Sequence, residues 1–342
     1  MPNAYPSTVT VNVGALSIED VVAVARYGAK VEIAPEALGE VAATRERVEE
    51  LAQDPTPVYG ISTGFGALAR RHIPEEMRAQ LQLSLVRSHA AGTGPEVEEE
   101  VIRALMLLRL STLCTGRTGV RPVVVETYAK ALNAGIVPVV REYGSLGCSG
   151  DLAPLAHCAL ALLGEGEVRV NGELQDAGDA LAAAGIEPLQ LREKEGLALI
   201  NGTDGMLGQL CLAITDLRAT AKTADIATAM TVEGLLGTLV VFADDLQQLR
   251  PHPGQADAAA NILQVAEGSE ILEAALEEFK KNQVQDAYSV RCAPQVAGGF
   301  RDTLAHTAQV AERELAAAVD NPVVTKDGRV VSNGNFHGAP VA

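Results

Sequence analysis

The stretch from Gly144 to His157 holds the residues whose types and spacing most clearly suggest chemistry. It reads Gly-Ser-Leu-Gly-Cys-Ser-Gly-Asp-Leu-Ala-Pro-Leu-Ala-His. Glycine at 150 allows a bend in which its amide nitrogen can approach the carbonyl group of Cys148. Ser149, between these two residues, can lose its hydroxyl group as water. The tripeptide therefore suggests a reaction of the backbone itself.

The residues after the tripeptide predict a helix, because Asp151 can cap its start and Pro154 fits its first turn. A Gly-Cys-Ser-Gly-Asp run is also typical of an ordinary turn followed by a helix cap. The rest of the chain must decide between these two interpretations.

Asn201 lies at the head of the longest predicted helix, in the sequence Leu-Ile-Asn-Gly-Thr-Asp. The unpaired N–H groups of a first helical turn attract electron-rich groups. The amide of Asn201 can orient a ligand there, or it can simply cap the helix.

Tyr288 and Arg291 share the segment Gln-Asp-Ala-Tyr-Ser-Val-Arg-Cys-Ala-Pro-Gln, which begins at Gln285. An arginine can bind a carboxylate through two parallel hydrogen bonds. A phenol can exchange a proton if its pKa falls from its usual value of about 10. As surface residues, the two side chains would have no such role.

Two glycine-rich loops and a histidine complete the set of candidates. Tyr59 opens the loop Tyr-Gly-Ile-Ser-Thr-Gly-Phe-Gly, and Phe336 lies within Asn-Gly-Asn-Phe-His-Gly. His89 follows Ser88 at the predicted end of a helix, where a histidine also interacts favourably with the helix dipole.

Composition excludes several classes of function. The 342-residue chain is 47% hydrophobic, which supports a large globular core, and its 44 acidic and 27 basic residues give a net charge of -17. Such a charge disfavours binding to nucleic acid and to anionic membranes. With 3% aromatic residues and no Trp, base-stacking surfaces are also disfavoured.

The cysteines and histidines indicate neither disulfides nor a metal site. The five cysteines are scattered without a Cys-x-x-Cys pair, and the six histidines show no spacing typical of metal ligands. The N-terminus has no basic segment followed by an apolar one. We therefore expect a cytoplasmic protein with free thiols and no metal.

The hydrophobic pattern predicts a mainly α protein with few strands. A strand is expected at residues 8–13, and two small hairpins at 168–174 and 323–331. Helices are expected at 17–26, 35–53, from 74 to about 89, 96–114, 121–134, 204–250, 256–279 and 301–319. The 204–250 helix carries too many charged residues to cross a membrane, so it is expected inside a helical bundle.

Taken together, five segments resemble the aromatic amino acid ammonia-lyase family. They are Tyr-Gly-Ile-Ser-Thr-Gly-Phe-Gly, Gly-Ser-Leu-Gly-Cys-Ser-Gly-Asp-Leu-Ala-Pro-Leu, Leu-Ile-Asn-Gly-Thr, Gln-Asp-x-Tyr-Ser-x-Arg-Cys-x-Pro-Gln and Gly-Asn-Phe-His-Gly, in that order. The resemblance covers nearly the whole chain. It implies a long-helix bundle of the ammonia-lyase or L-aspartase-like type. An N-terminal domain (residues 1–200) would carry the reactive loop, and residues 201–342 would begin the central bundle.

The resemblance also implies a prosthetic group and a role for each candidate residue. Cys148, Ser149 and Gly150 would cyclise with loss of two waters to 4-methylidene-imidazol-5-one (MIO), with no metal or diffusible cofactor. Tyr59 would act as the general base, and Arg291 would bind the substrate carboxylate. Asn201 and Tyr288 would orient the amine and the cyclic group. Gln285 and Phe336 would line the pocket.

The Ser88–His89 pair resembles the members of the family that act on histidine. This implies elimination of ammonia from L-histidine to give trans-urocanate, the first step of histidine degradation, with His89 in substrate binding. A polar selector is physically reasonable, because an imidazole without partners in an apolar pocket would be costly. The alternatives are a tyrosine or phenylalanine ammonia-lyase or aminomutase with the same group, and an inactive, truncated helical scaffold.

Three departures from the family pattern stand out. Cys148 replaces a common Ala but supplies only its backbone to the ring, and Asp204 replaces a common Gln near the site. The family continues well beyond the position of Ala342, so we expect the C-terminal helical segment to be absent here. Family members are homotetramers with shared active sites, which implies that Tyr288 and Arg291 can serve the Ser149 of a neighbour.

Overall fold

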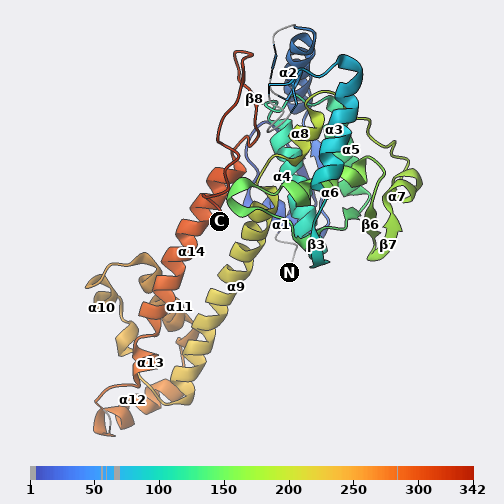
Figure 1. The fold of residues 1–342 in the computed structure, drawn as a ribbon. Helices are drawn as coiled ribbons and strands as arrows, with labels where there is room; N and C mark the ends of the chain where they lie inside the picture. The colour runs from blue at the N-terminus through green and yellow to red at the C-terminus, as the bar shows by residue number, and fades with distance from the viewer. Residues whose placement is uncertain (1–4, 55–56, 59, 65–69, 283) are drawn as a thin grey trace. The chain divides into compact units, whose positions relative to one another are not determined.

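The computed structural model describes residues 5–54, 57–58, 60–64, 70–282 and 284–342. The chain is predominantly helical, as predicted (Figure 1). It forms two compact units, one made of Met1–Leu212 with Val310–Ala342 and the other of Ala213–Gln309. The predicted division into residues 1–200 and 201–342 stays a prediction.

The first unit begins with a small β–α–β arrangement. Strand β1 (Thr8–Val11) pairs in parallel with β2 (Lys30–Ile33), and α1 (Ile18–Tyr27) connects them. Ser17 starts α1 with a capping box, in which its hydroxyl group accepts from the amide of Asp20 at 3.0 Å and the Asp20 carboxylate accepts from the amide of Ser17 at 3.0 Å. The strand predicted near residue 8 is confirmed, whereas its partner β2 was not predicted.

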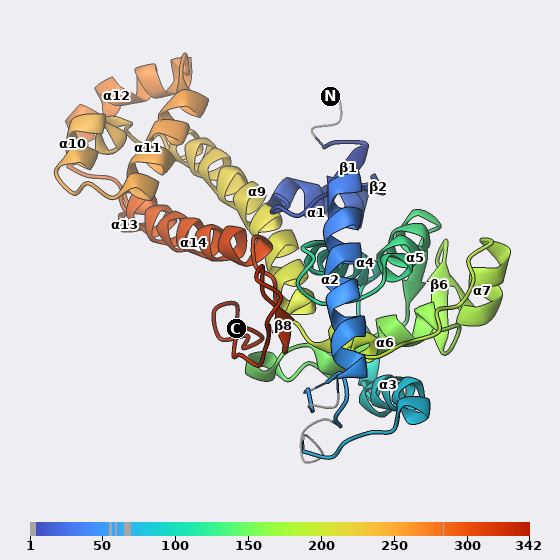
Figure 2. The same ribbon diagram turned by 90° about the horizontal axis from the view of Figure 1, so that it is seen from above.

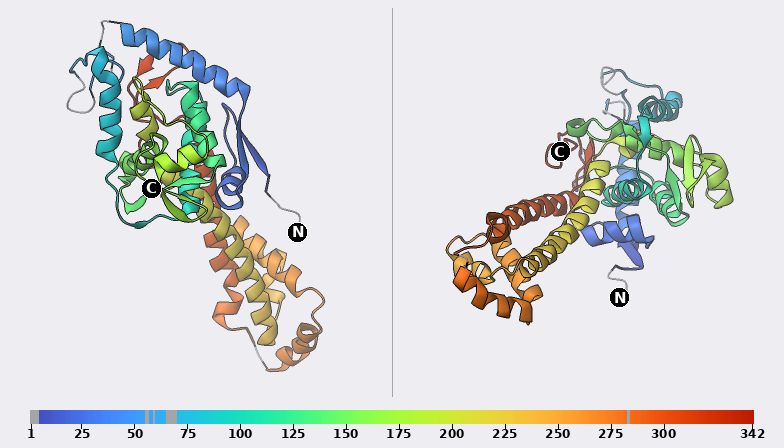
Figure 3. Two further views of the ribbon diagram at one scale, coloured as in Figure 1. Left: turned by 90° about the vertical axis from the view of Figure 1, so that its right-hand side faces the viewer. Right: turned by 90° about the horizontal axis from the view of Figure 1, so that it is seen from below.

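Helix α4 (Glu99–Cys114) lies at the centre of the first unit. From Ala104 to Cys114 all of its residues are buried, which its near-continuous apolar sequence explains. Helices α1, α2 (Pro35–Gln53) and α5 (Pro122–Asn133) pack around it (Figure 2). The left view of Figure 3 shows α2 along its length.

The remaining elements of the first unit are short helices and strand pairs that surround this core. The helices are α3 (Glu75–His89), η2 (Gly147–Ser149), α6 (Leu152–Leu162), α7 (Ala177–Ala183) and α8 (Glu195–Ile200). All of these strands pair antiparallel: β3 (Thr93–Glu96) pairs with β5 (Arg141–Tyr143), and β8 (Val323–Val324) pairs with β9 (Val330–Val331). A three-stranded sheet has the order β4 (Ile136–Pro138), β6 (Glu167–Val170), β7 (Glu173–Asp176). Both predicted hairpins, β6–β7 and β8–β9, are confirmed.

The predicted helix over 204–250 is too long. Helix α9 spans Asp204–Gly234, and the chain then turns at Leu236, which has a left-handed φ of 54°. The short helices η3 (Val240–Phe242) and α10 (Asp244–Gln248) follow. Gly234 and Gly237 flank the turn, and their low helix propensity outweighs the apolar pattern that favoured one continuous helix.

The predicted helix over 256–279 is likewise two helices, α11 (Pro253–Ala266) and α12 (Glu270–Asn282). Gly268 separates them with a φ of 76°. The last long helix, α14 (Ala293–Leu315), starts earlier than predicted and follows the single turn of α13 (Tyr288–Arg291).

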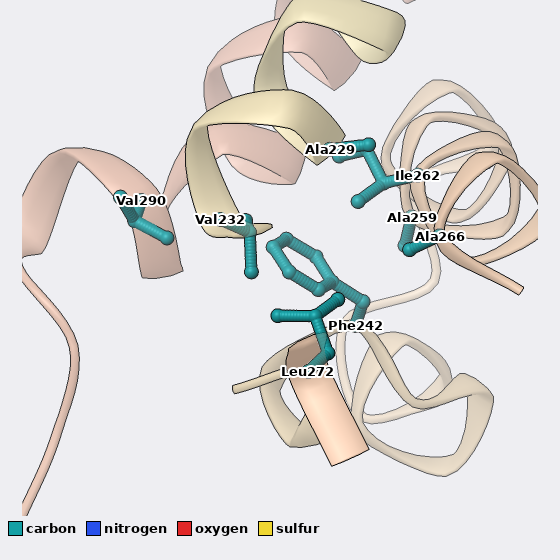
Figure 4. Packing of buried hydrophobic residues seen from close by; sticks show 8 residues of the cluster. All are labelled: Ala229, Val232, Phe242, Ala259, Ile262, Ala266, Leu272 and Val290. Carbon is teal, nitrogen blue, oxygen red and sulfur yellow. The ribbon is translucent and has the colours of Figure 1, made fainter. Parts of the chain in front are cut away.

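The second unit has its own hydrophobic core around the fully buried ring of Phe242. Val232 of α9, Ile262 of α11 and Leu272 of α12 surround this ring (Figure 4). The core thus joins helices that are far apart in the sequence. Packing of this kind stabilises the short helices, which would be marginal alone.

The expectation that charged residues rule out a membrane span is wrong for one window, because the segment Glu195–Gly234 is long and apolar enough to cross a membrane by length and composition alone. However, 72% of its most apolar window is buried within the protein. This burial supports the interpretation of α9 as a core helix.

Candidate active site

The tripeptide Cys148-Ser149-Gly150 forms a tight turn. Helix η2 makes one 3-10 turn over Gly147–Ser149, and Gly150 follows with a φ of 93°, which favours glycine. A Cβ atom on Gly150 would lie only 2.8 Å from the carbonyl oxygen of Gly202. Both the backbone conformation and the space therefore require glycine at 150.

Hydrogen bonds hold the backbone groups of this turn in place. The amide of Ser149 donates to the carbonyl of Leu146 at 3.4 Å, and the amide of Gly150 donates to the carbonyl of Gly147 at 2.9 Å. The carbonyl oxygen of Cys148 accepts a hydrogen bond from the amide of Gly338 at 2.9 Å. The Ser149 and Gly150 amides thus each have a hydrogen-bond acceptor, and the Gly338 amide polarises the Cys148 carbonyl.

The C-terminal loop completes this turn. The end of the chain lies beside the loop that carries the tripeptide (Figure 2). The Phe336 carbonyl oxygen lies 3.8 Å from the position of a Cβ on Gly150, and a Cβ on Gly338 would lie 2.6 Å from the Gly147 carbonyl. The backbone of Phe336 thus lies close to Gly150, and its predicted role in lining the pocket stays a prediction.

Asp151 does not cap its own helix, contrary to the prediction. Its Oδ1 accepts from the Ser145 hydroxyl at 2.6 Å, and its Oδ2 accepts from the Met206 amide at 3.0 Å, in the first turn of α9. The carboxyl group is only 1% exposed, and burial raises its pKa. Asp151 thereby ties the reactive loop to the start of α9, which a local capping rule could not reveal.

Asn201 is buried and held by the segment just after α14. Its Nδ2 donates to the Asn321 carbonyl at 2.9 Å and to Asp320 Oδ1 at 3.4 Å. Asp320 also forms an ion pair with Lys194, and both side chains of this pair are fully buried. Burial lowers the pKa of the Lys194 ammonium group, and the Asp320 carboxylate opposes this shift. The Asn201 side chain is thus fixed in one orientation.

Asp204 is neutralised by Arg109, although the sequence suggested that its carboxylate would alter the electrostatics of the site. The Arg109 guanidinium pairs with Asp204, and both side chains are almost completely buried. Although burial works against it, the Asp204 carboxylate raises the pKa of Arg109. The signal for this role was an arginine inside the apolar run Met-Leu-Leu-Arg-Leu.

His89 is half-buried at the end of α3. Its Nδ1 lies 2.9 Å from the Leu85 carbonyl oxygen and 3.0 Å from the Ser88 hydroxyl oxygen. Three residues beyond the helix, the amide of Gly92 donates to His157 Nε2 at 3.1 Å. The end of α3 is thus linked to α6, the helix that follows the reactive loop.

The second unit carries three of the predicted site residues. Tyr288 is 74% exposed, and the Arg291 guanidinium carbon lies 5.4 Å from the centroid of its ring. The Nε atom of Arg291 is buried and has no hydrogen-bond partner among the described residues. Gln285 is exposed. Such an incompletely paired guanidinium is suited to binding an anionic group.

The first unit therefore brings together Cys148, Ser149 and Gly150 with the backbone of Phe336. Cys148 and Ser149 are exposed, so a small molecule could reach the Ser149 side chain. Tyr59 lies outside the described residues. Sequence reasoning missed Arg109, Lys194 and Asp320, and it gave Asp151 only a capping role, although these charged residues hold the loops around the tripeptide.

Comparison with known proteins decides the family. The family model described as aromatic amino acid lyase matches residues 16–342. The chain belongs to this family. The family is the MIO-dependent class of lyases, and the observed turn at residues 148–150 fits the tripeptide from which that group is made.

Curated members of the aromatic amino acid lyase family include close relatives of this chain. A histidine ammonia-lyase of Streptomyces avermitilis is 63% identical over 336 residues, and one of Streptomyces coelicolor is 62% identical over 336 residues. Each alignment covers 98% of this chain and 65% of the relative. The chain therefore spans about two thirds of the length of these relatives.

Solved structures in this family share the fold. A tyrosine aminomutase of Streptomyces globisporus matches with a TM-score of 0.91 at 39% identity, covering 98% of this chain and 66% of the other. A histidine ammonia-lyase of Trypanosoma cruzi matches with a TM-score of 0.88 at 38% identity, covering 98% of this chain and 62% of the other. The predicted fold class is thereby confirmed.

Proposed function

We propose that the protein is a histidine ammonia-lyase that eliminates ammonia from L-histidine to give trans-urocanate. The observation that carries this proposal is the tight, glycine-requiring turn at Cys148-Ser149-Gly150, in which a donor polarises the Cys148 carbonyl. The identity to histidine ammonia-lyases and the Ser88–His89 pair at the end of α3 support histidine as the substrate.

The prosthetic group would form from the chain itself. The Gly150 nitrogen bonds to the Cys148 carbonyl carbon, and the Cys148 oxygen leaves as water with one proton from each of the Gly150 and Ser149 amides. Ser149 then loses its hydroxyl group and its Cα proton as a second water, which leaves a methylidene carbon. The hydrogen bond from Gly338 polarises the carbonyl that is attacked. Holding the reacting atoms in one turn lowers the entropic cost of closure.

The other residues would bind and orient the substrate. The MIO group supplies an electrophile that makes the substrate amine a better leaving group. Arg291 would bind the substrate carboxylate, His89 the imidazole, and Asn201 and Tyr288 would orient the amine and the cyclic group. Tyr59 would remove the β-proton, while Gln285 and Phe336 would line the pocket.

Assembly and location are part of the same proposal. We place the protein in the cytoplasm as a homotetramer, in which Tyr288 and Arg291 of one chain complete the site of another. The 74% exposure of Tyr288 within one chain supports this arrangement. The substrate is a small molecule, and the net charge of -17 disfavours nucleic acid and membrane surfaces as partners.

An aminomutase or lyase acting on tyrosine or phenylalanine is the second candidate. The similarity to the tyrosine aminomutase structure supports it, because the two folds match with a TM-score of 0.91. The Ser88–His89 pair opposes it, since a polar selector suits an imidazole better than an apolar ring.

The substrate is tested by incubating the complete protein with L-histidine, L-tyrosine and L-phenylalanine in parallel and following product absorbance. We expect turnover of histidine, with the other two slower by a factor of about 100 or more, because polar groups of the pocket would lose their partners. The Ser149→Ala variant is the matched blank. Turnover of tyrosine without turnover of histidine would rule out the assignment.

A further inference from the structure

Arg109 and Asp204 form a buried ion pair beside Gly202, which in turn contacts the turn at residues 148–150. Arg109 is fully buried on α4, and Asp204 is the first residue of α9. Besides the ion pair, Arg109 Nε donates to Asp204 Oδ2 at 3.2 Å. The Thr112 hydroxyl lies 3.5 Å from Asp204 Oδ1. A pair buried this deeply must be well satisfied, because unpaired charges there would be very costly.

Arg109 also holds the backbone of the loop that precedes α9. Its Nη1 donates to the carbonyl oxygens of Ala198 at 2.9 Å and Asn201 at 3.2 Å. A Cβ atom on Gly202 would overlap the Arg109 guanidinium and the Asp204 carboxylate. The ion pair therefore fixes the position of Gly202 from one side.

On its other side, Gly202 contacts the reactive turn. The carbonyl oxygen of Gly202 accepts from the Asp151 amide at 2.8 Å, and it lies 2.8 Å from the Cβ position of Gly150. A shift of Gly202 would thus be transmitted to Gly150, whose nitrogen must reach the Cys148 carbonyl carbon. A displacement of about 1 Å at a reacting atom can cost a factor of 100 in rate.

We propose that Arg109 and Asp204 are positioning residues for formation of the prosthetic group, acting through Gly202 on Gly150. This inference rests on the proposed function, because it presupposes that residues 148–150 cyclise. It assigns to the pair a role in maturation of the chain, separate from contact with substrate. The rate of ring closure then depends on the Arg109–Asp204 ion pair, although neither residue is part of the ring.

The test follows ring closure in the complete protein after synthesis, by the mass of the proteolytic peptide that contains residues 148–150. The variants are Arg109→Lys and Asp204→Asn. The control is Arg103→Lys, on the same helix, whose arginine donates to the carbonyls of Val24 at 2.8 Å and Leu132 at 3.4 Å instead. Far-UV circular dichroism and urea midpoints report whether each variant is folded.

We expect Arg109→Lys and Asp204→Asn to lose the two waters about tenfold or more slowly while folded, because misplaced reacting groups lose rate steeply. Arg103→Lys should cyclise at the parent rate. If the Arg109→Lys variant does not fold, the rate of water loss in the nearly isosteric Asp204→Asn variant tests the inference. Cyclisation of a folded Arg109 or Asp204 variant at the parent rate, or equal slowing in Arg103→Lys, would overturn the inference and leave the proposed function intact. A parent protein without the mass loss would overturn both.

Discussion

At the scale of single residues, the tripeptide Cys148-Ser149-Gly150 could be found from the sequence, but the charged residues that hold the loops around it could not. Small residues around a serine, followed by a helix start, singled out Cys148 to Gly150. The ion pairs that hold the neighbouring loop at Asn201 and Gly202 join residues 95 and 126 positions apart, Arg109 with Asp204 and Lys194 with Asp320. No local pattern relates charges at such separations, so only the folded chain reveals these pairs.

Lys194 gives a prediction at this scale. Replacing it with Met leaves the Asp320 carboxylate buried without its cation, and we expect a loss of about 3–5 kcal/mol in the free energy of unfolding. Urea denaturation of the Lys194→Met variant measures this loss. The control is Lys326→Met at an exposed position, with an expected change within about 0.5 kcal/mol. Similar midpoints for the two variants would contradict a structural role for the buried pair.

At the scale of elements, helix types and most positions were predictable, and helix ends were less so. The apolar periodicity located α1, α2, α4 and α5, because each buries one or more faces in the core. It failed from Gly234 to Phe242, where the apolar pattern continues but glycines and a left-handed Leu236 turn the chain. The apolar pattern indicates which residues are buried, but it does not indicate where the backbone changes direction.

His157 links two elements and gives a prediction about pH. Burial, with a smaller contribution from Arg141, lowers the pKa of His157 below its usual value near 6.5. The neutral ring accepts the hydrogen bond from Gly92, whereas a protonated ring cannot. Between the folded pKa and 6.5 the unfolded chain binds more protons, so the free energy of unfolding falls as the pH falls through this window.

We therefore expect His157→Gln, which keeps an acceptor but does not titrate, to lose less stability than the parent between pH 7.5 and pH 5.5, about one unit either side of 6.5. Urea midpoints at the two pH values measure this difference. His306→Gln, at an exposed position, serves as the control. An equal loss in the parent and in His157→Gln would show that this histidine does not link α6 to the end of α3.

At the scale of the whole molecule, composition and motif order led to the right family. Low aromatic content and a strongly negative charge disfavoured nucleic acid partners, and five motifs in order indicated an ammonia-lyase of mainly helical fold. The sequence did not show that Ala213–Gln309 forms a compact unit with its own core around Phe242. That core depends on contacts among α9, η3, α11, α12 and α13, which local sequence patterns do not encode.

Tyr288, Arg291 and Gln285 belong to the second unit, whereas the tripeptide belongs to the first. Their predicted convergence therefore stays a proposal that depends on how chains assemble. The central proposal is that residues 148–150 form the reactive electrophile and that Ser149 is consumed in making it.

The mass of the proteolytic peptide spanning residues 148–150 from the mature complete protein tests this claim most directly. The account predicts a peptide lighter than its sequence by two water molecules, and a peptide of full mass in the Ser149→Ala variant apart from the substituted side chain. Circular dichroism of that variant should show an unchanged helical fold. A parent peptide at the full mass of its sequence, in protein that turns over L-histidine, would contradict the account.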